Sequence, residues 1–291
     1  MSYHITGYST ALFSTWFFID ELGLLFDAGD GLSAGLLQKS RKIKQVFISH
    51  ADRDHLCGLL QFHQLNARPG FPIIHYPKDS GSFPALRAFL ERFDPHVGGS
   101  QWLPIEQQQE VFIRKDLKIK AIRNNHVQVA PELNKSLSFQ LIHTKQKIKP
   151  AFEKLAGKEI AKIAKEKGKD FITYEVTKPL LGYSGDTPVE ADDRWDQTPI
   201  LIHEATFLEP SAQLNNHKNK HSTLDEVLKM VASIKVDQLI LSHFSSRYDP
   251  TEIDAAIRKY CKQYKVKIPV YRVLPGVVHR DILNEAPIND G

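Results

Sequence analysis

Short apolar runs, separated by turns rich in Gly, Asp and Pro, cover most of the chain and predict an α/β fold. Runs rich in Ile, Val, Phe and Tyr are typical of strands, whereas apolar residues three or four positions apart are typical of helices. Strands are expected at 3–9, 11–19, 23–27, 46–48, 72–76, 109–114, 117–124, 137–144, 180–184, 199–203, 238–241 and 270–273. Helices are expected near 56–63, at 83–93, within 145–170, at 224–233 and at about 251–264. Because no linker or short repeat interrupts this pattern, we expect one domain over residues 1–291.

The composition is that of an ordinary globular protein. Hydrophobic residues make up 42% and charged residues 25% of the 291 residues, which excludes a disordered chain, a collagen and a long coiled coil. The apolar stretch 11–19 is shorter than the roughly 20 residues of a membrane span, and no basic segment precedes it as in a secretory signal. We therefore expect a cytoplasmic protein with no membrane partner. Two cysteines, Cys57 and Cys261, can form neither a disulfide framework nor a Cys-rich zinc site.

One segment carries the whole basic excess of the chain. Residues 145–170 hold nine Lys and four acidic residues, a local charge of +5, and since the net charge is +4 the remainder of the chain is near −1. Within this segment Phe152, Leu155, Ile160 and Ile163 recur at helical spacing with lysines on the other face. Such a segment suits a polyanionic partner, and the alternative is an ordinary solvated helix face.

A group of metal-ligand types follows the predicted strand 46–48. His50, Asp52, Asp54 and His55 fall within six residues, between a strand and a helix. A loop in that place brings successive side chains together, and imidazole and carboxylate groups are common metal ligands. The alternative is a plain helix start, with Asp52 or Asp54 as the N-cap.

Three further candidate ligands lie at the ends of other predicted strands. His126 follows strand 117–124, Asp186 follows 180–184, and His243 follows 238–241. Open sheets bind ligands beyond the carboxyl ends of their strands. Seven residues drawn from several strands are the number that a two-metal site requires, so the sequence predicts such a site.

The order His-x-Asp-x-Asp-His, His126, Asp186 and His243 resembles the metallo-β-lactamase superfamily, and more narrowly ribonuclease Z, the transfer-RNA 3′-processing endonuclease. The resemblance covers the chain from about Gly7 to Gly276. Its motifs are the stretches 24–31, 183–187, 203–206, 220–223 and 241–248, of which the last three separate this subfamily from lactamases and glyoxalases. The resemblance implies an αββα sandwich: two mixed sheets face to face, helices outside, and metals at one edge.

The same resemblance implies the roles of the site residues. One metal would be held by His50, Asp52 and His126, and a second by Asp54, His55 and His243, with Asp186 bridging the two. Such donors suit zinc, with manganese or iron as alternatives, and two ions would activate a shared water against a phosphodiester. Asp54 would orient that water. His221, supported by Glu204, would protonate the leaving 3′-oxygen, whereas His203 would be structural.

His221 and Glu204 also have simpler interpretations than proton transfer, and these stay open. His221 lies in a polar loop before a helix, where exposed histidines are common. Thr223 and Glu226 have the spacing of a capping box, so this stretch would also serve as a simple helix start. Glu204 would then be a surface charge at the end of a strand.

The chain departs from the family pattern at two places. Asp52 stands where the family has a second histidine, which adds negative charge at the first metal and favours a harder ion, unless Asp52 is too short to reach. The second departure is the arm that grips transfer RNA, which here is expected to be reduced to the Lys-rich segment. Lys154, Lys158, Lys162 and Lys165 would meet phosphates there, and Ser245 and Arg247 would contact a phosphate near the scissile bond or form an ordinary loop contact.

The preferred hypothesis is a metal-dependent endoribonuclease that cleaves precursor transfer RNA 3′ of the discriminator base. One alternative is a phosphodiesterase of the same fold for small or cyclic nucleotides, which would have no use for a basic arm. A second alternative is an RNA- or protein-binding module whose metal centre has decayed through Asp52. The family resemblance also implies a homodimer in which the arm of one subunit serves the active site of the other.

Overall fold

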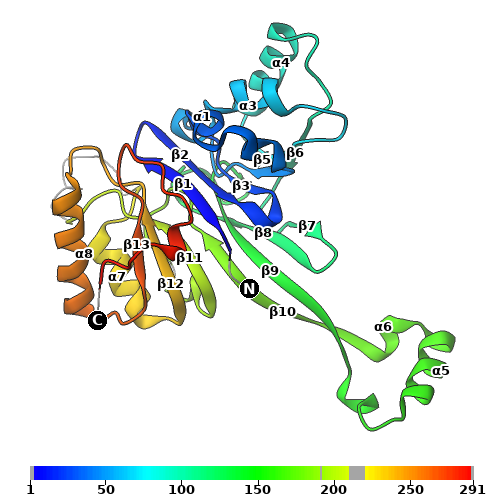
Figure 1. The fold of residues 1–291 in the computed structure, drawn as a ribbon. Helices are drawn as coiled ribbons and strands as arrows, with labels where there is room; N and C mark the ends of the chain where they lie inside the picture. Colours follow the sequence, from blue (N-terminus) through cyan, green and yellow to red (C-terminus); the bar gives the residue numbers. More distant parts are fainter. Residues whose placement is uncertain (1–2, 191, 210–219, 290–291) are drawn as a thin grey trace.

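The computed structural model describes residues 3–190, 192–209 and 220–289 and contains two mixed β-sheets (Figure 1). The first sheet has the strand order β1-β2-β3-β4-β5-β6, and the second β13-β12-β11-β10-β9-β8-β7. The strands of the first sheet are β1 (Ile5–Thr10), β2 (Ser14–Ile19), β3 (Leu24–Phe26), β4 (Gln45–Phe47), β5 (Ile73–Pro77) and β6 (Gln101–Ile105). Those of the second are β7 (Glu110–Arg114), β8 (Leu117–Arg123), β9 (Leu137–Ile148), β10 (Thr173–Tyr183), β11 (Thr198–Glu204), β12 (Val236–Ser242) and β13 (Val270–Arg272).

Alternate residues of the strands face opposite sides and build three apolar layers. Along β2, Phe17 faces the second sheet, whereas Trp16 and Phe18 face the helices outside the first. Along β12, Ile240 lies in the core between the sheets and Leu239 in the core beneath the outer helices. Because these strands are covered on both faces, side chains of both orientations are buried and apolar. The strands therefore appear in the sequence as nearly continuous apolar runs.

Helices cover the outer faces of both sheets. The principal ones are α1 (Leu32–Leu36), α2 (Arg53–Leu56), α3 (Leu59–Asn66), α4 (Ser82–Phe93), α7 (Leu224–Ser233) and α8 (Pro250–Tyr264). Residues of α1, α3 and α4 pack on the first sheet, and residues of α7 and α8 pack on the second. The predicted αββα sandwich is therefore confirmed.

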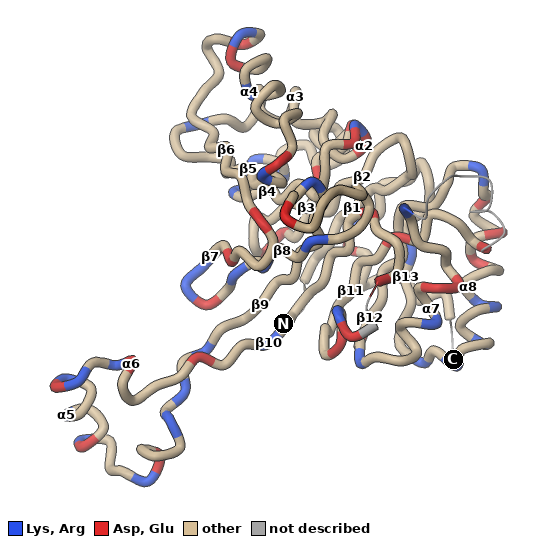
Figure 2. The backbone as a smooth tube through the Cα atoms, turned by 180° about the vertical axis from the view of Figure 1, so that it is seen from behind, with Lys and Arg blue, Asp and Glu red and all other residues tan. Residues whose placement is uncertain are grey.

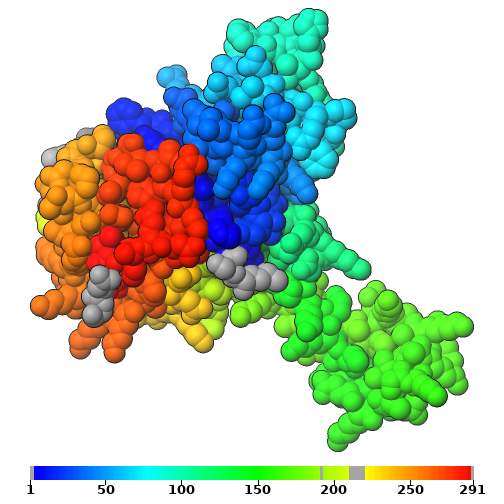
Figure 3. Space-filling model, in the orientation of Figure 1, coloured from blue at the N-terminus to red at the C-terminus, as the bar shows by residue number. Residues whose placement is uncertain are grey.

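The Lys-rich segment forms an arm that protrudes from the body of the molecule (Figures 1 and 3). Its stalk is the outer part of β9 and β10, which pair antiparallel from Thr173 with Ile148 to Tyr183 with Phe139. Its tip holds α5 (Gly157–Lys167) and α6 (Lys169–Ile172), where the ring of Phe152 lies 5.7 Å from that of Phe171. The expected helix is present, but it begins only at Gly157, and β10 begins seven residues before the predicted strand at 180.

Several other boundaries differ from the prediction. Residues 11–13 form a turn between β1 and β2 rather than the start of a strand, and neither α1 nor β6 was predicted. Pro250 begins α8, and Thr223 caps α7 in a capping box with Glu226, both as the sequence predicted. Within the described ranges no helix is long and apolar enough to cross a membrane. The cytoplasmic location stays a prediction.

Candidate metal centre

The seven predicted ligands lie at one edge of the sandwich because of the directions of the strands. Strands β10, β11 and β12 are parallel, and β8 runs the same way because β9 is antiparallel to both β8 and β10. The residues that follow these strands therefore emerge at the same edge of the second sheet. The loop after β4, in the first sheet, reaches the same place. The structure brings His50, Asp52, Asp54, His55, His126, Asp186 and His243 together in adjoining groups.

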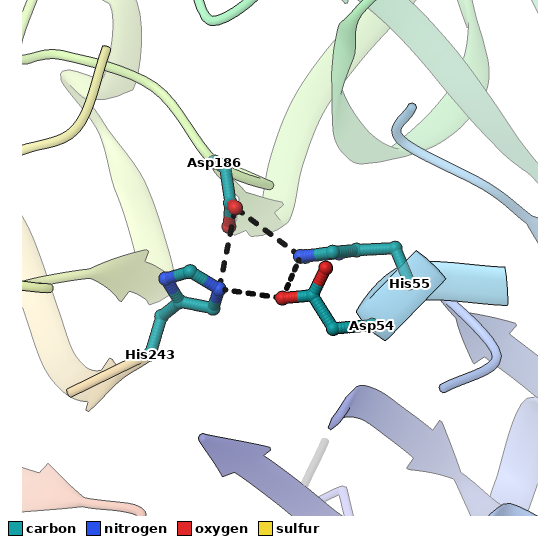
Figure 4. A group of neighbouring side chains, drawn as sticks. All are labelled: Asp54, His55, Asp186 and His243. Carbon is teal, nitrogen blue, oxygen red and sulfur yellow. Dashed lines mark hydrogen bonds and ion pairs between the residues drawn. The ribbon is translucent and has the colours of Figure 1, made fainter. Parts of the chain in front are cut away.

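The first group consists of Asp54, His55, Asp186 and His243, whose side chains point toward one another (Figure 4). Oδ2 of Asp186 lies 3.2 Å from Nε2 of both His55 and His243, and Oδ2 of Asp54 lies 3.5 and 3.4 Å from the same two nitrogens. Burial raises the pKa of Asp186, but His243 and His55 lower it further, so its net pKa is well below the ordinary value. The carboxylate is therefore held in the ionised form that a metal requires.

The second group consists of His50, Asp52 and His126. Oδ2 of Asp52 lies 3.6 Å from Nε2 of His50 and 3.4 Å from Nε2 of His126. Asp52 is thus long enough to reach both imidazoles, whose contacts lower the pKa of its carboxyl group. Asp52 is the N-cap residue of α2 but makes no side-chain capping hydrogen bond, so the simple helix-start interpretation does not account for its carboxylate.

All four histidines that were predicted as ligands are oriented with Nε2 toward the cluster. Their Nδ1 atoms each meet an acceptor: Ser49 Oγ for His50, Asp27 for His55, the Lys220 carbonyl for His126 and Thr206 Oγ1 for His243. Since Nδ1 donates in each case, Nε2 is left as the lone-pair donor, the arrangement typical of metal-bound histidine.

The donor set fits a pair of divalent ions. Nε2 of His50 and Nε2 of His55 are buried and have no hydrogen-bond partner among the described residues, which costs about 1–3 kcal/mol for a polar atom without a compensating contact. A tetrahedral ion with bonds near 2.1 Å separates its donors by about 3.4 Å, close to the spacings of 3.2–3.6 Å between these imidazole nitrogens and the carboxylates. These buried imidazole nitrogens and the carboxylates around them therefore have the positions of metal ligands.

Asp27 holds two of the predicted ligands in place, a role that was not predicted from the sequence. Its carboxylate is fully buried and accepts hydrogen bonds from Nδ1 of His55 at 2.7 Å, from the backbone and hydroxyl of Ser49, and from the Tyr183 hydroxyl. One carboxylate thus orients His55 directly and His50 through Ser49. The only sequence signal was the position of Asp27 at the end of an apolar strand within a family motif.

Beside the cluster, the buried Glu204 pairs with the partly exposed His221. Oε1 of Glu204 accepts from Nδ1 of His221 at 3.0 Å and from the Thr187 backbone at 2.6 Å, and Oε2 accepts from Thr206 Oγ1 at 2.5 Å. Glu204 is therefore not a surface charge, since only 1% of it is exposed. Burial lowers the pKa of His221, but Glu204 and Asp186 raise it more, to about 9. Nδ1 of His221 lies 3.9 Å from Asp186, so the pair borders the predicted ligands.

The remaining predicted residues lie outside the cluster. Arg247 donates from Nε to Ser245 Oγ at 3.0 Å and stacks on the rings of Phe207 and Tyr248, and it makes no ion pair with a described carboxylate. His203 is buried, with Nδ1 on the Glu204 carbonyl, away from the ligand set. Lys154, Lys158, Lys162 and Lys165 are exposed, and Figure 2 shows several Lys or Arg positions along the arm that carries α5 and α6.

Residues 24–244 match the model of the β-lactamase superfamily domain, so the chain belongs to the β-lactamase superfamily. Within it, the resemblance to ribonuclease Z is confirmed by curated relatives. The chloroplastic tRNase Z of Arabidopsis thaliana is 27% identical over 92% of this chain and 74% of its own length. Ribonuclease Z of Pyrococcus furiosus is 29% identical over 87% of each chain. Human tRNase Z, short form, has the same fold, with a TM-score of 0.56 at 20% identity over 84% of this chain and 93% of its own. Family and relatives together indicate a metal-dependent hydrolase.

Proposed function

We propose that this chain is a two-metal phosphodiesterase that cleaves precursor transfer RNA at its 3′ end. The observation that carries the proposal is the orientation of four histidine Nε2 atoms and three carboxylates into one cluster, with a basic arm on the same molecule. A small substrate would need the first feature but not the second. The relatives named tRNase Z and ribonuclease Z support RNA as the substrate.

In this proposal His50, Asp52 and His126 would hold one ion and Asp54, His55 and His243 the other, and Asp186, which contacts histidines of both groups, would complete the ligand set. When bound, the two ions would supply an activated water and neutralise the charge of the phosphodiester, and zinc fits these donors best, with manganese or iron as alternatives. Asp54 orients the attacking water. His221, held by Glu204 through Nδ1, donates a proton to the leaving 3′-oxygen.

The direct test is cleavage of a 3′-extended precursor transfer RNA by the purified protein with zinc or manganese added. A single cut after the discriminator base is expected, and His243→Ala should not cut because Nε2 of His243 faces both Asp54 and Asp186. Hydrolysis of a small phosphodiester without cleavage of RNA would instead support the small-nucleotide phosphodiesterase. Metal binding with no turnover on either substrate would support the decayed binding module.

The arm prediction concerns one face of α5. Lys158, Lys162 and Lys165 recur at i, i+4 and i+7, are exposed, and form no ion pair with an acidic residue in the described part of the chain, so they are available for phosphates. Replacing all three by alanine should raise KM for precursor transfer RNA roughly tenfold or more and reduce the slope of log K against log salt by about 2–3. Hydrolysis of bis(4-nitrophenyl) phosphate should not change.

The matched control for the arm replaces three exposed lysines elsewhere, Lys229, Lys262 and Lys267. It removes the same total charge but leaves the arm intact. If both triple variants weaken RNA binding equally, the effect is one of overall charge and the arm has no special part in binding.

The Asp52 prediction concerns metal preference. Because Asp52 Oδ2 faces His50 and His126, Asp52→His replaces a negative ligand by a neutral one and should shift preference toward the softer ion. We expect the ratio of zinc-supported to manganese-supported activity to rise about five- to tenfold, measured as kcat/KM after metal removal and reloading. Asp30→His, at an exposed position outside the cluster, is the control and should leave this ratio unchanged. An unchanged ratio in Asp52→His would mean that Asp52 is not a ligand.

We further propose that the protein is a homodimer and is located in the cytoplasm. The arm of one subunit would then serve the active site of the other, as the family resemblance implies. Sedimentation equilibrium tests the assembly, and a mass of about 33.1 kDa, that of one chain, would contradict it.

A further inference from the structure

The turn between β1 and β2 exposes two large apolar side chains at the edge of the candidate metal centre. Leu12 is 87% exposed, the highest value for any large hydrophobic residue in the described part of the chain, and its neighbour Phe13 is 61% exposed. Contiguous exposed apolar surface marks a contact site in a globular protein more often than a single exposed apolar side chain does. The inference below rests on the proposed function and names a contact that this same site makes with its substrate.

Hydrogen bonds attach this turn to two of the predicted metal ligands. The backbone N–H of Leu12 donates to Oδ2 of Asp54 at 3.1 Å, the oxygen that also faces His55 and His243. On the other side, the N–H of Ala11 donates to the carbonyl of Phe244 at 3.2 Å. The N–H of His243 donates to Ser9 Oγ at 2.9 Å. The exposed pair is therefore fixed at the border of the cluster.

The backbone of the turn is held in an unfavourable conformation. Leu12 has a φ of +69°, in the left-handed region that favours glycine over leucine. The N–H of Phe13 donates to the carbonyl of Thr10 at 3.0 Å and closes the turn. Strained residues cluster at functional sites, where the surrounding contacts maintain them. Here the strain keeps the Leu12 N–H on Asp54 while its side chain stays in solvent.

We propose that Leu12 and Phe13 form a stacking platform for an unpaired base next to the scissile phosphate. A phosphodiester that is cleaved at the cluster carries a base one sugar away on each side, and the turn borders the cluster at Asp54. Aromatic side chains bind unpaired bases of any sequence by stacking, which suits 3′ extensions of varied sequence. The aliphatic side chain of Leu12 extends the apolar surface beside the ring.

The test compares Phe13→Leu and Phe13→Tyr with the wild type on three precursor transfer RNAs. One RNA is intact, one has an abasic nucleotide immediately before the cut, and one has an abasic nucleotide immediately after it. On intact RNA we expect Phe13→Leu to raise KM about five- to tenfold, the lower range for loss of one base–aromatic stack, and Phe13→Tyr to behave as wild type. On the RNA abasic at the stacked position, wild type and Phe13→Leu should have the same KM, since their contact is already absent.

Phe93→Leu provides a matched control, because Phe93 is also 61% exposed and lies on α4, outside the cluster. It should leave KM unchanged. The platform proposal is wrong if Phe13→Leu raises KM as much on both abasic RNAs as on intact RNA, or if it leaves KM unchanged on all three. It is also wrong if Phe13→Leu lowers the mass of the protein in solution. The last result would mean that the pair contacts a second copy of the chain.

A second measurement separates this inference from the proposed function. RNA with 2-aminopurine beside the cut is bound to His221→Ala, in which cleavage is slowed but the turn is intact. Stacking on Phe13 should change the 2-aminopurine emission, and Phe13→Leu in the same background should abolish that change. If wild type cleaves no precursor transfer RNA, the proposed function fails, and this emission change alone decides whether the platform exists.

Discussion

Replacing Asp186 by asparagine should abolish hydrolysis of every phosphodiester, with a loss in kcat/KM of roughly a thousandfold or more. Oδ2 of Asp186 lies within 3.9 Å of four imidazole rings, those of His50, His55, His221 and His243. Asp186 thereby contacts histidines of both predicted metal groups. The amide removes the one negative charge between the two groups, so both ions should bind more weakly.

The measurement pairs activity with metal content per chain after dialysis. We expect fewer than two equivalents in Asp186→Asn, against two in the wild type. Asp237→Asn, at an exposed position of β12, is the control for loss of one carboxylate and should retain both metal and activity. Full metal content with no activity would assign Asp186 a part in the reaction other than holding ions. Full activity in Asp186→Asn would mean that Asp186 has no role in the reaction or in metal binding.

The positions of the seven predicted ligands were accessible from the sequence because they follow strands. A strand buried on both faces is a visible apolar run, and the first polar residues after it, such as His50 after β4 or His243 after β12, lie at the sheet edge where sites form. The order of motifs added the pairing of these residues into two groups. Metal binding by them stays a prediction, whereas their convergence is a property of the structure.

The groups that orient these ligands were not accessible in the same way. Asp27, Thr206 and the Lys220 carbonyl come from three separate parts of the chain, and each meets a histidine 28 to 94 residues away. Such pairs depend on how two sheets are packed, and a single sequence carries no periodic signal for them. Thr223 shows a different limit: its capping box is real, yet it does not exclude a role for His221 two residues earlier.

The arm was predicted as a basic helix, but its stalk was missed for a physical reason. The outer parts of β9 and β10 leave the sandwich, so Lys145, Gln146 and Lys147 are exposed in succession. A strand with no buried face shows no apolar alternation. The pairing of β9 with β10, from Thr173 with Ile148 onward, is a tertiary feature that the sequence alone did not reveal.

Replacing His221 by alanine should slow cleavage of RNA by about 10²–10⁴-fold while leaving hydrolysis of bis(4-nitrophenyl) phosphate within about fivefold of wild type. The reason lies in the leaving group. A ribose 3′-oxygen is a strong base and must receive a proton as it departs, whereas 4-nitrophenolate leaves without one. His221 is placed for this role because Glu204 accepts from its Nδ1 at 3.0 Å while the ring borders Asp186.

Glu204→Gln is the companion to His221→Ala in this experiment. An amide oxygen can still accept from His221 Nδ1, but it supplies no negative charge to stabilise the protonated ring, so the loss should again appear on RNA and be smaller on the nitrophenyl substrate. The two changes together should cost little more than His221→Ala alone, because Glu204 acts through His221. Equal losses on both substrates, with metal content reduced, would instead mean that the pair only supports the neighbouring ligands through Thr206 and Asp186.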